Sequence, residues 1–284
     1  MTAADWQALG YSASFLVLAL AIVYVGKLAR DAIALLRGHK MGEILTTKDN
    51  PAAAIEVSGY LLGLVFGLVG SFQVTSDGWV AQASELAMTG LLVTAMLLLN
   101  DWLTAKIVFR GLDNHKEVNE NHNTAVAVGR AAGAVATGLV IRGALGHDSA
   151  LLDRILWAFI GQAMLIVVSL LYQKLTPYDD LAELKGKNLA AGLPIAGILL
   201  AVGITVEAVL HGEGAGWAAD LQSMGVDMLA MVALLFAMRV ATDRVMLGGA
   251  RLKDEIVRDR NVGVGLIEAT SFVTGAVILA FFLS

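Results

Sequence analysis

The sequence predicts an all-α polytopic membrane protein with eight transmembrane helices, and three observations lead to that fold class. Hydrophobic residues make up 57% of the 284 positions and charged residues only 16%, whereas soluble domains average about 45–50% and about 25%. The apolar residues gather in eight runs, each near the roughly 20 residues that a helix needs to cross the hydrocarbon core. Finally, basic residues fall only in alternate connections between these runs.

The eight runs are expected to be helices because an open strand leaves backbone groups unpaired in lipid. The first run has no Lys or Arg before Lys27 and no small-residue cleavage site after it, so we expect a retained span rather than a signal peptide. Eight spans use about 160 positions and leave no room for a large domain outside the membrane. The predicted spans are residues 11–29, 52–72, 83–104, 123–145, 152–173, 189–210, 221–241 and 262–283.

The connections predict the orientation of the chain. All fifteen basic residues outside the spans follow the first, third, fifth or seventh run, and the other connections and the termini contain none. Because cytoplasmic loops collect Lys and Arg, both termini are expected outside the cytoplasm. The fifteen residues are Arg30, Arg37, Lys40, Lys48, Lys106, Arg110, Lys116, Lys174, Lys185, Lys187, Arg244, Arg251, Lys253, Arg258 and Arg260.

A tandem duplication divides the chain into two four-helix membrane repeats, predicted at residues 1–146 and 147–284. At an offset of 138 residues, block 50–55 matches block 188–193, and block 123–128 matches block 261–266. Each repeat holds four spans, so both repeats enter the membrane in the same direction. We therefore expect two parallel repeats that pack as a pseudo-dimer, related by a pseudo-twofold axis along the membrane normal.

Three stretches carry a resemblance to a known family. They are Leu-Thr-Pro-Tyr-Asp-Asp-Leu at 175–181, Lys-Asn-Leu-Ala-Ala-Gly at 187–192, and Arg-Asn-Val-Gly-Val-Gly-Leu at 260–266. They resemble the bacterial inner-membrane family catalogued as domain of unknown function 350, whose members carry one four-helix unit or two in tandem. The resemblance covers nearly the whole chain and implies an inner (plasma) membrane location and an association with envelope stress, but no established reaction. The first repeat departs from it, with Gly-His-Lys at 38–40 where the second has Thr-Pro-Tyr.

Small residues are expected to bring helices close together. Gly59, Gly63 and Gly67 are spaced by four in the second run, and Gly129 and Gly133 have the same spacing in the fourth. Such stripes are typical of tight helix packing in membranes. The alternative is that they let a helix bend for gating.

Five charged residues within the spans form a predicted polar belt in the cytoplasmic half. Each such charge costs about 2.5–3.5 kcal/mol at a helix centre and usually faces the bundle interior. Glu268, for example, shares a helical face with Ser271 and Gly275. The belt has three candidate roles: a buried ion-pair network, a polar cavity for an ion, proton or solute, and catalysis. The five residues are Glu56, Asp101, Arg130, Arg239 and Glu268.

The repeat offset also suggests how these charges pair. It maps Arg130 onto Glu268 and Asp101 onto Arg239, so equivalent positions carry opposite signs. We expect Arg130 to meet Glu268 or Glu56, and Asp101 to meet Arg239, across or near the pseudo-twofold axis. The alternative is that each charge pairs within its own repeat or snorkels to the surface.

No metal site, cofactor site or nucleic-acid partner is predicted. The chain has no cysteine, and its net charge of -5 argues against binding nucleic acid. The cluster of His115, Glu117, Glu120 and His122 fits no zinc signature and is expected to form a solvated amphipathic helix. Nucleotide-binding loops and nucleophile motifs are also missing from the sequence, so no enzyme is expected.

The function expected from these features is that of a non-enzymatic integral inner-membrane protein embedded in the lipid bilayer. The first hypothesis is a channel or transporter-like bundle whose polar belt handles a small ion or solute. The second is a non-transporting scaffold that docks a cytoplasmic or envelope-stress partner on its basic connections. A homo-oligomer is a further candidate assembly. A water-wide path to Glu56 and Glu268 would favour transport, whereas a dry, fully paired belt would favour scaffolding.

Overall fold

The computed structural model describes residues 3–70 and 78–283 and is all-helical apart from one two-residue parallel bridge, β1 (His147–Asp148) with β2 (Gly212–Glu213). Within those residues eight helices are long and apolar enough to cross a membrane, which confirms the predicted fold class. The predicted span end at 72 and residues 73–77 of the connection 73–82 lie outside the described residues. The long helices are α1 (Ala3–Leu36), α3 (Pro51–Val69), α4 (Gly78–Ile107), α6 (Thr124–Gly146), α7 (Leu151–Leu175), α9 (Leu189–Leu210), α10 (Trp217–Ala241) and α11 (Val262–Leu283).

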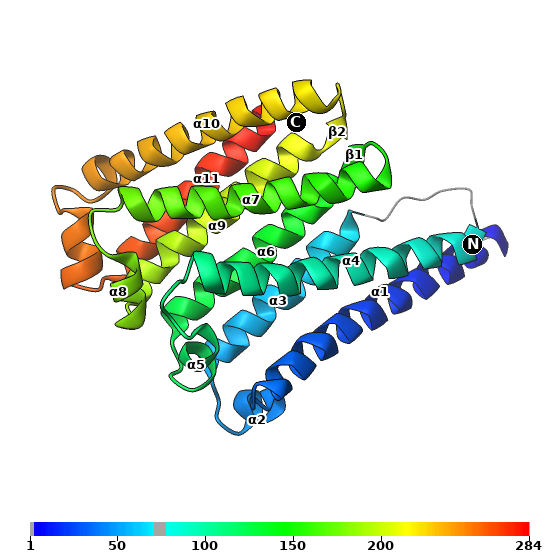
Figure 1. Cartoon of the computed structure of the whole chain (residues 1–284), viewed down its shortest axis with the longest axis horizontal. Coiled ribbons are helices and arrows are strands. Elements are labelled where there is room, and N and C mark those ends of the chain that lie inside the picture. The colour runs from blue at the N-terminus through cyan, green and yellow to red at the C-terminus, as the bar shows by residue number, and fades with distance from the viewer. Residues whose placement is uncertain (1–2, 71–77, 284) are drawn as a thin grey trace.

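The long helices form four hairpins that stand side by side in two layers (Figure 1). The turn of each hairpin carries short helical segments, and these gather at one end of the molecule, on the left in Figure 1; we call this the short-helix end. The segments are α2 (Met41–Thr46), α5 (Asn114–Asn119), α8 (Asp180–Lys185), η1 (Thr242–Met246) and η2 (Asp254–Arg258).

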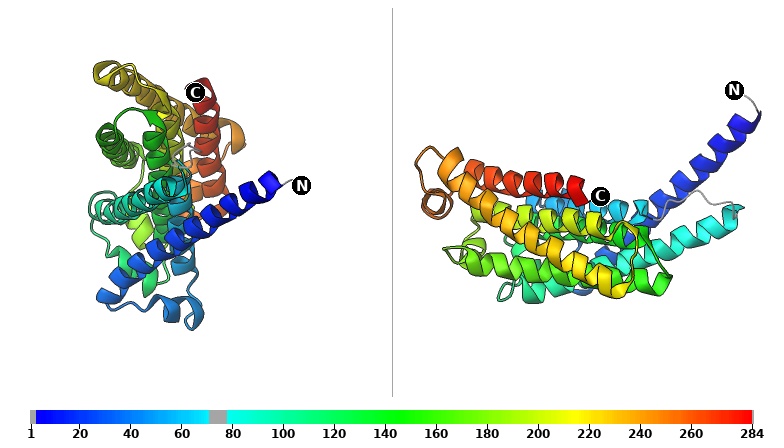
Figure 2. Two further views of the ribbon diagram at one scale, coloured as in Figure 1. Left: turned by 90° about the vertical axis from the view of Figure 1, so that its right-hand side faces the viewer. Right: turned by 90° about the horizontal axis from the view of Figure 1, so that it is seen from above.

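The second helix of each hairpin belongs to the inner layer. Here α3 packs against α6, α6 against α9, and α9 against α11. The first helices form the outer layer, in which α4, α7 and α10 each pack against two successive inner helices. Helix α1 packs against α3 and α4; its N-terminal part leaves the inner layer (Figure 2, right) but still contacts α4, where Tyr11 Oη donates to Gln82 Oε1 at 2.6 Å.

Each inner helix begins at an asparagine. In α3, α6 and α9 the side-chain oxygen of this N-cap residue accepts hydrogen bonds from backbone N–H groups of the first turn, which would otherwise lack a partner. Asn261 Oδ1 accepts from Val264 N in the same way before α11. The residue before each asparagine has a left-handed φ between 44° and 57°, so all four chain entries share one backbone shape. These residues are Asp49, His122, Lys187 and Arg260.

The same asparagines join successive hairpins. The side-chain Nδ2 of the first three donates a hydrogen bond of 2.8 Å to a backbone carbonyl in the turn of the following hairpin. We call this contact the asparagine connector, because each hairpin uses it to bind the next. The three connectors are Asn50 to Val118 O, Asn123 to Leu184 O, and Asn188 to Ile256 O.

Close approach within the inner layer depends on small residues. A Cβ on Gly59 or Gly63 would overlap the backbone of α6, and one on Gly67 would meet a valine side chain of α4. A Cβ on Gly129 would meet an aromatic ring in the α4–α5 connection, whereas one on Gly133 would make only ordinary contacts. Most of these glycines therefore lie where neighbouring helices touch, as small residues commonly do in membrane bundles.

The predicted pseudo-twofold axis between the repeats is not confirmed. The offset of 138 maps α3 onto α9 and α6 onto α11, so a twofold would turn the α6–α9 contact into a second contact between α11 and α3. Instead, α3 and α11 lie at opposite ends of the inner layer (Figures 1 and 2). The asparagine connector explains this difference, because it always points from one hairpin to the following one and therefore builds an open row.

Candidate functional site

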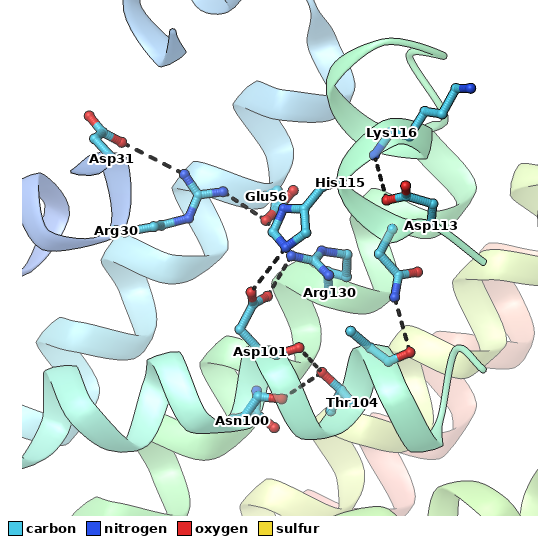
Figure 3. A network of polar contacts seen from close by, with 12 residues as sticks. Arg30, Asp31, Glu56, Asn100, Asp101, Thr104, Asp113, His115, Lys116 and Arg130 are labelled. Carbon is cyan, nitrogen blue, oxygen red and sulfur yellow. Dashed lines mark hydrogen bonds and ion pairs between the residues drawn. The ribbon is translucent and has the colours of Figure 1, made fainter. Parts of the chain in front are cut away.

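The first charge cluster joins α1, α3, α4 and α6 near the short-helix end (Figure 3). Glu56 Oε1 accepts hydrogen bonds from Arg30 Nη2 at 2.7 Å and from Arg130 Nη2 at 2.9 Å. The same Arg130 nitrogen donates to Asp101 Oδ1 at 2.5 Å. Two guanidinium groups and two carboxylates therefore bind one another, and their charges cancel.

This cluster is largely closed to solvent. The side chain of Arg130 is 1% exposed and that of Glu56 6%, whereas Asp101 is 33% exposed. A buried charge persists only where a partner compensates its lost hydration. The geometry thus provides that compensation on both sides of Arg130, with the more exposed carboxylate at the edge of the cluster.

His115 of α5 lies beside the first cluster, with Nε2 3.8 Å from Asp101 Oδ2. Burial and the nearby Arg130 charge lower the pKa of His115 to about 4, so the imidazole is neutral at pH 7. Glu117 faces another way and accepts hydrogen bonds from the Asn121 and Asn123 amides. The sequence cluster of histidines and carboxylates therefore does not converge on one point, and α5 buries one face while the rest is more exposed, as in an amphipathic helix.

The second charge cluster joins α7, α10 and α11. Arg239 Nη1 lies 2.9 Å from Glu268 Oε1 and donates a hydrogen bond of 2.9 Å to Tyr172 Oη. The Arg239 guanidinium also lies 5.4 Å from the centroid of the Tyr172 ring, within the range of a cation–π contact. The Glu268 side chain is fully buried. This pair is simpler than the first cluster, because the repeat equivalent of Glu56 is Pro194.

Asp180 of α8 and Tyr178 extend the second cluster toward the short-helix end. Asp180 is buried, and its Oδ2 accepts a hydrogen bond of 2.5 Å from Thr176 Oγ1. Burial raises the pKa of Asp180 to about 7, and burial also raises the pKa of Tyr178. Asp180 therefore changes its protonation near neutral pH, which an exposed aspartate does not do.

The structure corrects the predicted pairing across the repeats. Asp101 does not meet Arg239, and Arg130 does not meet Glu268, because each of these charges pairs within its own repeat. The expected contact between Arg130 and Glu56 is present. The reason is the order of the inner layer: α9 lies between α6, which carries Arg130, and α11, which carries Glu268.

Several polar residues in these clusters were not singled out by the sequence reasoning. Arg30 was counted with the basic connections, yet its side chain lies within the bundle and is 13% exposed. The sequence carried a signal that the first helix continues past residue 29: Lys27 and Asp31 are four residues apart, a spacing at which opposite charges pair on a helix. They form this ion pair within α1. Tyr172 and Asp180 gave no such signal, because their roles depend on helices that are distant in sequence.

A chain of hydrogen-bonded neutral side chains, separate from the two charge clusters, also crosses the interior. Gln162 Nε2 donates to Asn100 Oδ1 at 2.6 Å, and Thr137 Oγ1 donates to Gln162 Oε1 at 2.9 Å. All three residues are buried. Interhelical hydrogen bonds of this type hold membrane helices together, and here they join the second hairpin to the third.

A cavity of about 410 Å³ opens between α7 and α10. Its walls are mainly apolar and include Leu171 and Phe236, while Tyr172 and Arg239 of the second cluster also line it. Arg251 and Lys253 also line it. Glu268 is not among the lining residues, so its paired carboxylate is separated from this space. Among the residues that the structure describes, no three His, Asp or Glu side chains converge as metal ligands would.

Comparison with known proteins gives one family match. A family model described as Domain of Unknown Function (DUF350) matches residues 4–145, 77–171 and 148–283. The first and third segments correspond to the two halves of the chain, and the second segment begins about one hairpin later than the first. The overlap agrees with a row of similar hairpins. No curated protein and no solved structure matches the chain.

Proposed function

The chain belongs to the family described as Domain of Unknown Function (DUF350), and from that premise we propose that it is a non-transporting membrane scaffold. In this proposal the polar belt holds the hairpins in register, and the basic short-helix end binds a protein partner. The protein acts in the bacterial inner membrane, with both termini outside the cytoplasm, and performs no catalysis.

The observation that carries the proposal is that each buried carboxylate of the belt lies within ion-pair distance of an arginine. The carboxylate of Glu56 contacts two arginines, and that of Glu268 contacts Arg239. Both carboxylates are buried, and neither lines the cavity between α7 and α10. A group that passes an ion or proton needs access to water, whereas a group that fixes helix packing needs only its partner.

Transport is the second candidate function, and the cavity favours it. Arg239 lines this cavity and contacts Glu268, so a small movement of α10 would expose the Glu268 carboxylate. In this alternative the second cluster, rather than the whole belt, handles the ion or solute.

Flux through purified protein in liposomes separates the two functions. We expect proton and potassium flux equal to that of protein-free liposomes, with a known ionophore as the positive control. Flux above this background, abolished by Glu268→Gln and retained in Glu207→Gln, would overturn the scaffold and support transport. Glu207 is a matched control, because it is also a carboxylate within a span, paired with Arg142 at 3.4 Å but away from the cavity.

A further inference from the structure

The three contacts between inner helices use the same positions each time. Counted from the N-cap asparagine, the residues at positions 2, 9 and 13 of α3, α6 and α9 are all alanine or glycine and all buried. They lie against the next inner helix, as shown by the contacts of Gly59 with Ala131, Ala136 with Gly203, and Gly197 with Ala269. We call these positions the forward face. The nine residues are Ala52, Gly59, Gly63, Ala125, Ala132, Ala136, Ala190, Gly197 and Ala201.

The helix that receives each contact also repeats its positions. Positions 4 and 8 of α6, α9 and α11 are all alanine or glycine, and we call them the backward face. Thus Ala125 of the forward face meets Gly192 of the backward face, and Ala190 meets Gly265. One interface geometry is therefore used three times within the chain, which is the property of a repeat protein.

At the two ends of the row these faces have no partner helix among the described elements. On α11 the forward face consists of Gly263, Thr270 and Thr274, all small and all exposed. On α3 the backward face consists of Ala54 and Ser58, also small and exposed. The rest of the exposed α11 surface carries large apolar side chains, including Leu266, Val277 and Ile278, which suit lipid. Small residues at the contact positions suit another helix instead.

The asparagine connector is also incomplete at one end. Asn50, Asn123 and Asn188 are almost completely buried under the following hairpin, whereas Asn261 is exposed. Its Nδ2 donates to Glu255 Oε2 at 2.9 Å, and none of the described elements supplies it with a backbone carbonyl like those that the other three asparagines bind.

The matching acceptor lies at the opposite end of the row. Asn123 N donates to Glu117 O, and Val118, the next residue, provides the connector carbonyl. Asn50 N likewise donates to Ile44 O, so the equivalent carbonyl in the first hairpin belongs to Leu45. Among the described residues no asparagine side chain donates to this carbonyl.

The outer layer is incomplete at the same end. Helices α4, α7 and α10 of the outer layer each pack against two inner helices, but α1 packs against one inner helix, α3. An inner helix placed beside α3, on the side away from α6, would supply the second contact. Among the described elements α11 has the one free forward face, and it lies at the far end of the row (Figure 1).

We propose that the chain associates head to tail with a second copy of itself, the α11 end of one copy packing against the α3 end of the next. Gly263, Thr270 and Thr274 of one copy meet Ala54 and Ser58 of the other, and Asn261 donates to Leu45 O across the junction. The inference goes beyond the scaffold function proposed above: that function places a protein partner at the short-helix end, whereas this contact joins copies of the chain through the sides of α3 and α11. Such a heterologous contact continues into a longer row or closes into a ring.

Cysteine cross-linking in membranes tests this contact. The chain has no native cysteine, so only the introduced cysteines can form disulfides. Internal contacts pair position 9 of one helix with position 8 of the next, as in Gly59 with Ala131. The variant Ser58→Cys/Thr270→Cys is therefore expected to form dimers, trimers and larger species on oxidation. Adding Thr274→Leu, a larger residue at an exposed position, should reduce these species severalfold without unfolding the monomer.

Three controls define the contact. Ser58→Cys alone and Thr270→Cys alone should remain monomeric, because a head-to-tail junction brings different positions together. Ser58→Cys/Ala233→Cys, with the second cysteine exposed on α10, measures random collision in the membrane. A double variant that cross-links no more than this control overturns the proposal. Equal dimer formation by a single variant overturns it too, since that result indicates a twofold contact.

The outcomes are independent of those for the proposed function. Cross-linked ladders together with ion flux would retain the head-to-tail row and overturn the non-transporting scaffold. A result with neither ion flux nor cross-linked species would overturn the head-to-tail row and leave the non-transporting scaffold in place. Ladders without flux are the result expected from both proposals.

Discussion

Arg130 holds the first charge cluster together. One of its nitrogens binds the carboxylates of Glu56 and Asp101, which reach it from two other helices. Without the guanidinium, Glu56 would keep Arg30 as its partner, and Asp101 would lose its hydrogen bond to a buried donor. The residue therefore determines whether α3, α4 and α6 can meet at this depth.

The first prediction concerns this arginine. Arg130→Met is expected to lower the free energy of unfolding by about 3–5 kcal/mol, because it removes the partner that Glu56 and Asp101 share from a largely buried ion-pair network. Denaturation of the purified protein in detergent measures the change. Arg142→Met is the matched control on the same helix: Arg142 lies 3.4 Å from Glu207 but its side chain is 38% exposed, so we expect a loss below about 1 kcal/mol. Equal losses in the two variants would contradict the assigned role of Arg130.

The second prediction concerns Asp180, whose pKa rises from an ordinary value of 3.8 to about 7 in the folded protein. Between these values the native state binds a proton that the unfolded chain has released. The free energy of unfolding therefore falls as the pH rises from about 4 to 7, by at most about 1.4 kcal/mol per pH unit. Asp180→Asn should remove this contribution and be relatively more stable above pH 7.

His115 acts in the opposite sense, because its pKa falls from an ordinary value of 6.5 to about 4 and its contribution to stability is lost as the pH falls through that range. The change in the free energy of unfolding with pH must therefore be compared between variants. Asp179→Asn is the control, since Asp179 is exposed and caps α8, a role that asparagine also fills. A pH dependence unchanged in Asp180→Asn would show that this carboxyl does not titrate as expected.

At the scale of the element, the hairpin is the unit from which the molecule is built. Its second helix begins at an asparagine whose oxygen caps the helix and whose nitrogen binds the following hairpin. One side chain thus connects local structure with tertiary packing. The cap requires only an acceptor, whereas the connector requires the amide hydrogens.

The third prediction separates these two roles. Asn123→Asp keeps the cap to Val126 N but removes the donor to Leu184 O and places a carboxylate beside Glu117. We expect a loss of about 1–3 kcal/mol in unfolding free energy, the usual effect of an unpaired buried polar group. The same change at the exposed Asn261 should cost clearly less in the detergent-solubilised monomer. Similar losses at both positions would show that capping, not the connector, is the main role.

At the scale of the whole molecule, the four hairpins form an open row with their short helices at one end (Figure 1). The basic connections of the sequence belong to that end, and the connections at the other end carry no Lys or Arg. The charge asymmetry thus follows the long direction of the bundle and predicts its orientation in the membrane.

The fourth prediction tests this orientation. A reporter that is active only in the periplasm should be active when fused after Ser284 and inactive when inserted within residues 251–260. One site precedes α11 in the chain and the other follows it, so they should give opposite results in either orientation of the protein. Activity at the second site but not the first would invert the topology and place both charge clusters near the outer surface.

The sequence by itself determined the number of spans and the start of each inner helix, because hydrophobic length and N-cap chemistry are local properties. It also contained the hairpin repeat, since Asn50, Asn123, Asn188 and Asn261 recur at similar spacings, although the offset of 138 compared only alternate members. Only the tertiary structure decided how the repeats are arranged and which charges meet. A fixed offset assigns equivalent residues the same depth whether the repeats face each other across an axis or follow one another in a row. The neighbour of Arg130 depends on which helix packs beside α6. The asparagine connectors and the small residues on the contact faces of the inner helices determine that packing.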